Sequence, residues 1–197
     1  MEVMRNMTID TELFELGDII SFTLTTGENV KAKAIRETPN GMLFITVDCL
    51  KDEQKMFENP GRDEKVDYEY SDLRKKLNGE IFESFPEEIK GRMVGMRVGQ
   101  TNCFGMLRIP TEREIFGENP YGKAECDAVK RFKGMKKRRN RIAFDRSEEG
   151  KEKWQWYWLQ NRVEDTAAGF ARVNYSGIAN YSNASCSHGV RPVFLLS

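Results

Sequence analysis

Alternating apolar and polar positions dominate the first fifty residues and predict β-strands. Residues 17–27 and 30–35 alternate apolar with polar or hydroxyl side chains, and residues 42–50 form a mostly apolar run. The signal Pro39-Asn40-Gly41 predicts a tight turn before the last of these segments. Since period-two alternation gives each strand one apolar face, residues 17–50 are expected to form an antiparallel meander of three short strands.

A helical period replaces this alternation further along the chain. The charged stretch 51–69 predicts an exposed loop, and Ser71 then supplies a cap for a helix. A second short helix is expected at Pro86, and a third at Thr111, where Thr-Glu-Arg-Glu fits a capping box. The apolar stripe of the first helix recurs at i, i+4, i+8 and i+9: Leu73, Leu77, Ile81 and Phe82.

The last part of the chain is rich in aromatic and then in small polar residues. Trp154, Trp156 and Trp158 alternate as on one face of a strand, where we expect them to be core anchors rather than an exposed stacking site. An apolar strand is expected over residues 189–196. The predicted class is α+β, with short irregular antiparallel sheets, two to four helices and much loop.

Composition limits the class of protein without indicating a reaction. The chain has 197 residues, 39% of them hydrophobic, with 31 basic and 31 acidic side chains, which argues against global disorder and a wholesale nucleic-acid binder. Residues 1–100 hold 14 basic and 20 acidic side chains, so the two halves carry about −6 and +6 and either attract each other or mark an anionic partner for the second half. No signal-peptide pattern or run of about 18 apolar residues is present, so we expect a cytoplasmic protein when made and no membrane partner.

The segment 130–141 is the strongest local charge feature, with eight basic side chains in twelve residues. One interpretation is a phosphate-binding patch, which would make the chain a nucleic-acid-associated protein. The other, which we favour, is a solvated segment that pairs with the acidic first half. No Tyr or Trp is interleaved to stack on single-stranded bases.

Cysteine and histidine usage gives no metal or cofactor site. Cys49, Cys103, Cys126 and Cys186 form no Cys-x-x-Cys pair, and the chain has one histidine, so zinc is not expected. Cys49 lies in an apolar run and is expected to be core. Cys186, beside His188 in a polar stretch, is the one thiol worth testing for reactivity.

Three motifs resemble a bacterial and prophage domain family of unknown function that is widespread in gut Firmicutes. They are Ser-Asp-Leu-Arg…Leu-Asn at residues 71–78, Trp-Tyr-Trp-Leu at 156–159 and Gly-Val-Arg-Pro at 189–192. The last two also resemble the C-type-lectin-like fold of formylglycine-generating enzymes and of variable proteins diversified by retroelements. The resemblance implies an N-terminal segment, 1–16, and one lectin-like domain, 17–197. Within this domain, strands over 17–50 and helices over 70–97 precede a lectin-like half over 107–197.

The resemblance implies binding rather than catalysis. The sugar-binding triplets of calcium-dependent lectins are absent, and Cys186 has no second cysteine beside it to match the catalytic pair of formylglycine-generating enzymes, so no catalytic or metal-binding residue is assigned. In variable proteins the diversified positions precede the terminal Gly-Val-Arg strand. The corresponding residues are typical of an adaptable binding surface: Asn174, Tyr175, Ser176, Asn180, Tyr181, Ser182, Asn183, Ser185, Ser187 and His188.

Three hypotheses of function follow. The first is a prophage-encoded, virion-associated or cytoplasmic display module, monomeric or homo-oligomeric, that binds a protein or glycan surface through residues 174–188. The second is a nucleic-acid-associated phage protein that uses residues 130–141. The third is an oxidative enzyme of the formylglycine-generating type that acts through Cys186. We expect Arg191, Trp156 and Trp158 to belong to the scaffold.

Overall fold

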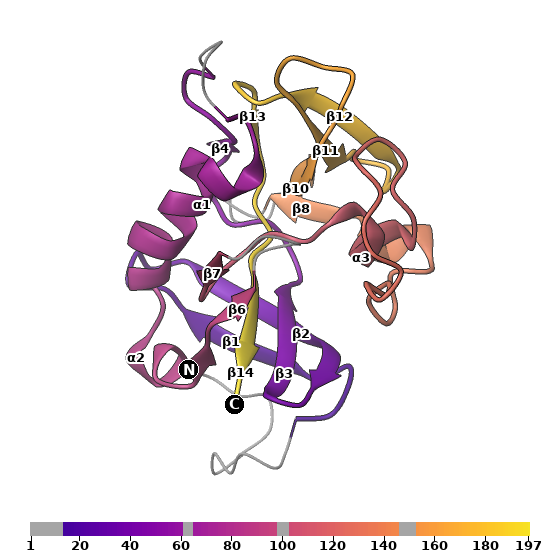
Figure 1. The fold of residues 1–197 in the computed structure, drawn as a ribbon. Helices are drawn as coiled ribbons and strands as arrows, with labels where there is room; N and C mark the ends of the chain where they lie inside the picture. The colour runs from indigo at the N-terminus through magenta and orange to yellow at the C-terminus, as the bar shows by residue number, and fades with distance from the viewer. Residues whose placement is uncertain (1–13, 61–64, 98–102, 146–152) are drawn as a thin grey trace.

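The computed structural model describes residues 14–60, 65–97, 103–145 and 153–197, and shows a mixed fold of short antiparallel sheets and few helices (Figure 1). The expected α+β class is therefore confirmed. The largest sheet has the order β1-β2-β3-β14-β5, so the last strand of the chain lies inside it. Its strands are β1 (Ile19–Thr23), β2 (Asn29–Thr38), β3 (Gly41–Thr46), β14 (Val193–Leu196) and β5 (Met93–Val94).

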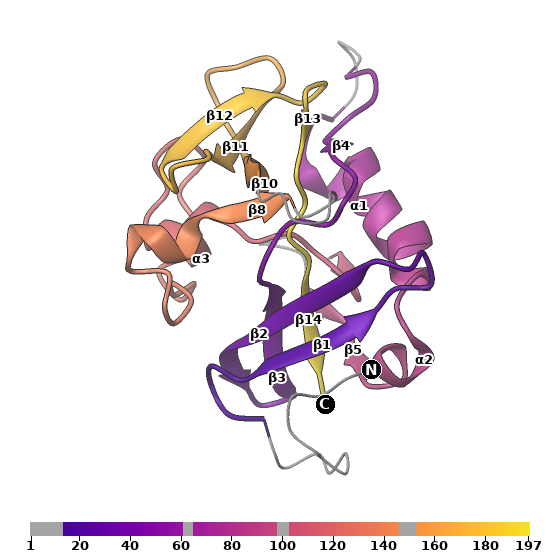
Figure 2. The same cartoon turned by 180° about the vertical axis from the view of Figure 1, so that it is seen from behind.

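A three-stranded sheet forms the other end of the molecule, where β11 lies between β10 and β12 (Figure 2). Its strands are β10 (Tyr157–Arg162), β11 (Gly169–Val173) and β12 (Ala179–Asn183). The remaining strands form two-stranded pairs: β4 (Gln54–Lys55) with β13 (Ser187–His188), β6 (Met96–Arg97) with β7 (Phe104–Gly105), and β8 (Ala143–Asp145) with β9 (Lys153–Gln155).

The helices begin where the capping signals predict. The Ser71 side chain accepts a hydrogen bond from the Arg74 N–H, and Thr111 and Glu114 form the expected capping box. Gly117 ends the third helix at φ 85°, a left-handed conformation that favours glycine. No helix among the described residues is long and apolar enough to cross a membrane. The helices are α1 (Asp72–Lys76), continued by the π-helical η2 (Leu77–Ile81), α2 (Glu87–Lys90) and α3 (Glu112–Phe116), with 3₁₀ turns η1 (Tyr68–Tyr70) and η3 (Arg138–Arg141).

The first of the three motifs fastens the helices to the rest of the fold. Asn78 Nδ2 donates to the Leu107 carbonyl at 2.9 Å, and the Leu107 N–H donates to Asn78 Oδ1 at 3.1 Å. Arg74 donates to the Phe104 carbonyl at 3.1 Å, while Leu73 and Leu77 are buried in the core. The motif therefore has a structural role over its whole length.

Two hydrophobic clusters share strand β10. Trp158 belongs to the first cluster, which includes Phe44 and Phe194 of the five-stranded sheet. Tyr157 and Leu159 belong to the second cluster, which includes Ile45 and Leu195 of the same sheet. The tryptophan run does not form one continuous strand, because it divides between β9 and β10 at Trp156. As a result Trp158 is fully buried, Trp156 is partly exposed and Trp154 is exposed, so the expected core position is confirmed for Trp158 alone.

The prediction of an exposed loop over 51–69 is wrong in part. This stretch contains β4 and the start of η1, and four of its side chains are buried in the same hydrophobic cluster as Trp158. The charged residues between them obscured this packing in the sequence. The buried side chains are Met56, Phe57, Val66 and Tyr68.

The Gly-Val-Arg-Pro motif joins the sheets. Gly189 donates its N–H to the Trp156 carbonyl at 2.8 Å, and its carbonyl accepts from the Trp158 N–H at 3.1 Å. The buried Arg191 guanidinium donates two bonds, of 3.0 and 2.8 Å, to the Thr46 carbonyl. A third bond of 3.2 Å goes to the Tyr157 hydroxyl. The expectation that Arg191 belongs to the scaffold is confirmed.

Gly189→Ala tests this junction. The added Cβ would lie 2.6 Å from Cys49 Sγ and 2.9 Å from the Trp156 carbonyl oxygen, closer than packed atoms approach. We expect a loss of about 1–3 kcal/mol in the free energy of unfolding, typical of an overpacked core, measured by urea denaturation. Gly95→Ala is the control, because nothing lies within 4 Å of its Cβ position. Equal stability of the two variants would contradict the close approach.

Candidate functional site

The polar segment 174–188 presents two surfaces rather than one. In the β11–β12 register, Arg172 faces Asn180 and Ala171 faces Tyr181. Residues directly opposite each other share one face of a sheet, and neighbours along a strand alternate between faces. Asn180 and Ser182 therefore lie on the same face as Arg172, and Tyr181 lies on the other face.

The two exposed tyrosines of the segment have different aromatic neighbours. Tyr175, 53% exposed at the hairpin turn, stacks on Trp156 with ring centroids 6.1 Å apart and an angle of 18° between the planes. Tyr181, 44% exposed, packs against Tyr121 at 5.2 Å. The tyrosines are thus parts of separate surfaces.

Several of the predicted binding residues stabilise their own turns. Asn174 Oδ1 accepts from the N–H groups of Ser176 and Ile178 and from the Ser176 hydroxyl, at 2.9–3.0 Å. Asn183 Oδ1 accepts in the same way from the N–H and hydroxyl of Ser185, at 3.0 and 2.9 Å. These are Asx turns, in which the side chain replaces a backbone acceptor. Part of the Asn and Ser content is therefore turn chemistry.

A buried arginine and a buried histidine contact Trp156, the ring on which Tyr175 stacks. Arg172 is 6% exposed, and its guanidinium carbon lies 3.5 Å from the centroid of the Trp156 ring. His188 is 8% exposed, and its ring centroid lies 5.6 Å from that of Trp156 and 4.5 Å from that of Trp158. We call Trp156, Arg172, Tyr175, Asn180 and His188 the arginine–aromatic site.

Each of the two buried side chains leaves one nitrogen without a hydrogen bond. Arg172 Nε donates to the Tyr181 carbonyl at 3.2 Å, but Arg172 Nη1 and His188 Nε2 are buried and have no partner within the described part of the chain. Burial, and then the charge of Arg172, lowers the pKa of His188 to about 4, so the imidazole is neutral at pH 7. His188, which was expected on an exposed face, is instead part of the floor of this site.

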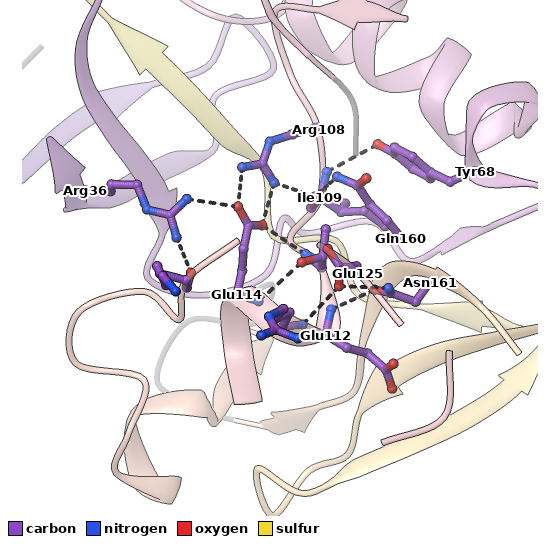
Figure 3. A network of polar contacts seen from close by, with 12 residues as sticks. Arg36, Tyr68, Arg108, Ile109, Glu112, Glu114, Glu125, Gln160 and Asn161 are labelled. Carbon is purple, nitrogen blue, oxygen red and sulfur yellow. Dashed lines mark hydrogen bonds and ion pairs between the residues drawn. The ribbon is translucent and has the colours of Figure 1, made fainter. Parts of the chain in front are cut away.

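A second polar cluster surrounds α3 (Figure 3). Arg108 forms two bonds of 2.7 Å with Glu114, and Arg36 approaches the same carboxylate at 3.6 Å. Glu112 accepts from the N–H groups of Tyr121 and Gly122, at 3.2 and 2.8 Å. Burial raises the pKa of Glu112 to about 7, against the effect of these N–H groups. Because its carboxylates are occupied by donors of the chain itself, we interpret this cluster as structural; apart from the capping box, no sequence motif indicated it.

We expected the basic segment 130–141 to pair with the acidic first half of the chain, but it forms no ion pair with the residues of that half that the structure describes. Phe132 and Met135 anchor it in the second cluster, and none of its basic side chains forms an ion pair with a described residue. An open pocket of about 510 Å³ adjoins it. The exposed basic side chains are Lys130, Arg131, Lys133, Lys136, Lys137, Arg138 and Arg139.

The cysteines form no disulfide. Cys49 is buried as expected, and Cys186 is exposed near Arg172. Among the described residues, no group of three His, Cys, Asp or Glu side chains is placed to hold a metal ion.

His188→Phe keeps an aromatic ring beside Trp158 and removes the titrating group. Because the folded pKa of about 4 lies below the value of 6.5 for a free histidine, the unfolded chain binds the proton first, and the wild type loses stability as the pH falls from about 6.5 to 4. Between pH 7 and 4.5 we expect the wild type to lose roughly 2 kcal/mol more than the variant, measured by urea denaturation. Parallel pH profiles would contradict the buried, neutral imidazole.

The comparisons with known proteins identify a family without an assigned activity. A family model described as Domain of unknown function (DUF6273) matches residues 40–197, which include all three motifs. No curated protein and no solved structure matches the chain. The match covers most of the sequence, and the chain therefore belongs to the DUF6273 family.

Proposed function

We propose that the protein is a non-catalytic binding module that presents the arginine–aromatic site to a protein or glycan surface. The observation that carries the proposal is the pair of buried, unpartnered nitrogens on Arg172 and His188, two side chains that contact Trp156, on which the exposed Tyr175 stacks. Native proteins satisfy nearly all their buried polar groups, so two neighbouring exceptions in one place indicate a partner from outside the chain.

The surrounding scaffold is suited to holding such a site. We interpret it as lectin-like, because its sheets are short, loops are abundant, and the first and last strands, β1 and β14, belong to one sheet. Three site residues, Arg172, Asn180 and Tyr175, lie on β11, β12 and their connecting turn. Trp156 lies just before β10 and His188 lies in β13, next to the buried Trp158 and Arg191 of the core. A recognition surface on rigid strands loses little conformational entropy when it binds.

We also propose a prophage origin and diversification by a retroelement, which the nucleotide sequence around the gene would test. We expect a near-copy of the 3′ end, differing only at adenines, beside a reverse-transcriptase gene. Positions that hold their own turns tolerate little change, so the differences should spare Asn174 and Asn183 and concentrate at Tyr175, Asn180 and Ser182. Sequencing of the locus checks this prediction. A locus without such a copy would contradict diversification by a retroelement.

Tyr175→Ala and Tyr181→Ala form a matched pair that locates the binding surface. Once a ligand is found on glycan and cell-surface protein arrays, we expect Tyr175→Ala to weaken its binding at least tenfold, as for an aromatic hot spot. Tyr181→Ala, on the opposite face of the sheet, should leave the affinity unchanged. Both side chains are exposed, so each variant should keep its melting temperature. Loss of binding in Tyr181→Ala alone would contradict the proposed surface.

A second candidate function rests on the unpaired basic segment 130–141. Seven exposed basic side chains without an ion-pair partner among the described residues favour a nucleic-acid backbone as ligand. The open pocket next to this segment is lined by Lys130, Arg131 and a further basic residue, Arg113. One acidic residue, Glu118, also lines it.

Two lysine pairs test this second function. The double variant Lys136→Gln, Lys137→Gln should bind duplex DNA more weakly and lower the slope of log K against log salt by about 2, roughly one unit for each lost phosphate contact. The control is Lys75→Gln with Lys76→Gln, two lysines of α1 that pair with Asp72 and Glu80. Equal slopes for the two double variants in fluorescence-anisotropy titrations would rule out the segment.

A further inference from the structure

We propose that the arginine–aromatic site receives the carboxylate of an acidic saccharide, with Arg172 as its principal donor. This inference rests on the proposed binding function and names the chemistry of its ligand. Three comparisons within the molecule support it: how other buried arginines are neutralised, how much charge the site holds, and which groups surround it.

Arg172 differs from the other buried arginines of the described chain. Arg108 is neutralised by two bonds to Glu114, and Arg191 places three bonds on the Thr46 carbonyl and the Tyr157 hydroxyl. Arg172 donates one hydrogen bond, to the Tyr181 carbonyl, and its guanidinium lies against the face of the Trp156 ring. Its Nη1 is buried without a partner. Leaving a buried charged donor unpaired is costly, so an incoming anion would gain the bonds that the chain does not provide.

The charge of the site fits a monoanion. Arg172 supplies one positive charge, and the pKa of about 4 makes its neighbour His188 neutral at pH 7. A carboxylate carries one negative charge in a planar group that matches the fork of a guanidinium, whereas a phosphate monoester or a free sulfate carries up to two. The neutral imidazole has room for one further hydrogen bond at Nε2, and a second oxygen or a hydroxyl of the ligand would complete it.

The neighbours of Arg172 favour a sugar ring over a peptide side chain. Tyr175 lies nearly parallel to Trp156 and is half exposed, which gives a flat apolar surface of the kind that the C–H face of a pyranose covers. Asn180 lies directly opposite Arg172, and Ser182 follows two residues later on the same face. An amide and a hydroxyl beside a guanidinium provide donors and acceptors for ring hydroxyls around the carboxylate.

Access to the buried nitrogens requires a side chain to move. Arg172 Nη1 and His188 Nε2 are closed to solvent in the unbound chain. Tyr175 is the exposed member of the site and lies at a hairpin turn whose backbone is held by Asn174. The sheet and this turn can stay in place during the movement, because side chains change rotamer within nanoseconds, much faster than strands rearrange.

Matched acid and ester probes test the proposal. Glucuronate-, galacturonate- and sialate-terminated oligosaccharides are titrated into the full chain by calorimetry, each beside the methyl ester of its acid. We expect at least one acid to bind ten times more tightly than its ester. Arg172→Lys should abolish that preference. Arg162→Lys should keep it, because Arg162 belongs to the same sheet and its guanidinium reaches the Ala167 carbonyl instead.

A second measurement does not depend on the variant folding. In the ¹⁵N-labelled wild type, the Arg172 side-chain Nε–H signal should shift when the acid is added and stay in place when the ester is added. Equal binding of acid and ester, together with loss of binding in Tyr175→Ala, would overturn the carboxylate but leave the proposed function standing. Unchanged affinity of acid and ester for Tyr175→Ala would overturn both the carboxylate and the proposed binding function. If no acid binds at millimolar concentration, the ligand is not an acidic saccharide. Binding of an acidic peptide through Arg172, with no saccharide bound, would contradict the saccharide in the same way.

Discussion

The last ten residues of the chain are the constraint on which the rest of the fold depends. In passing through the middle of the molecule they pair with β4, bridge β10 at Gly189, bridge Arg108 at Val193, and finally enter the large sheet between β3 and β5 (Figure 1). His188 to Leu196 is buried throughout. Because this segment contributes to both hydrophobic clusters, neither end of the molecule can pack without it.

This dependence explains why the family motifs and the candidate site share one residue alone, Trp156. Asn78, Trp158, Gly189 and Arg191 all make contacts between distant parts of the chain, so they preserve the fold whatever the ligand is. Three of the five residues of the arginine–aromatic site lie on the β11–β12 hairpin, which this framework supports. Family membership therefore describes the framework, and we expect the ligand to be determined mainly by side chains outside the motifs, Arg172 and Tyr175 among them.

The buried arginines of the chain show how one residue type takes two roles. Where an arginine joins elements, as Arg108 and Arg191 do, its donors are occupied by a carboxylate or by carbonyl and hydroxyl oxygens. Where a buried donor has no partner, as at Arg172 Nη1, the surrounding structure encloses a charge that its hydrogen bonds do not fully satisfy. Such a charge is more simply explained by a ligand than by stability, because a hydrophobic residue of similar size would pack there without that cost.

Local sequence signals determined the elements of this protein, and the tertiary structure decided their exposure and their grouping. Period-two alternation, the caps at Ser71 and Thr111 and the turn at Gly117 act within a few residues, which is why the meander and the three helices could be predicted. The division of the tryptophan run at Trp156, the burial of Met56 and the placement of Arg172 and Tyr181 on opposite faces of a sheet depend on strand register and on partners about a hundred residues away. Asn174 and Asn183 look in sequence like binding residues because the same side chain can bond a ligand or its own backbone, and only the folded turn selects between them. Arg172 was absent from the sequence-based site for the same reason: an arginine becomes an unsatisfied donor only when the rest of the chain encloses it and gives it no acceptor.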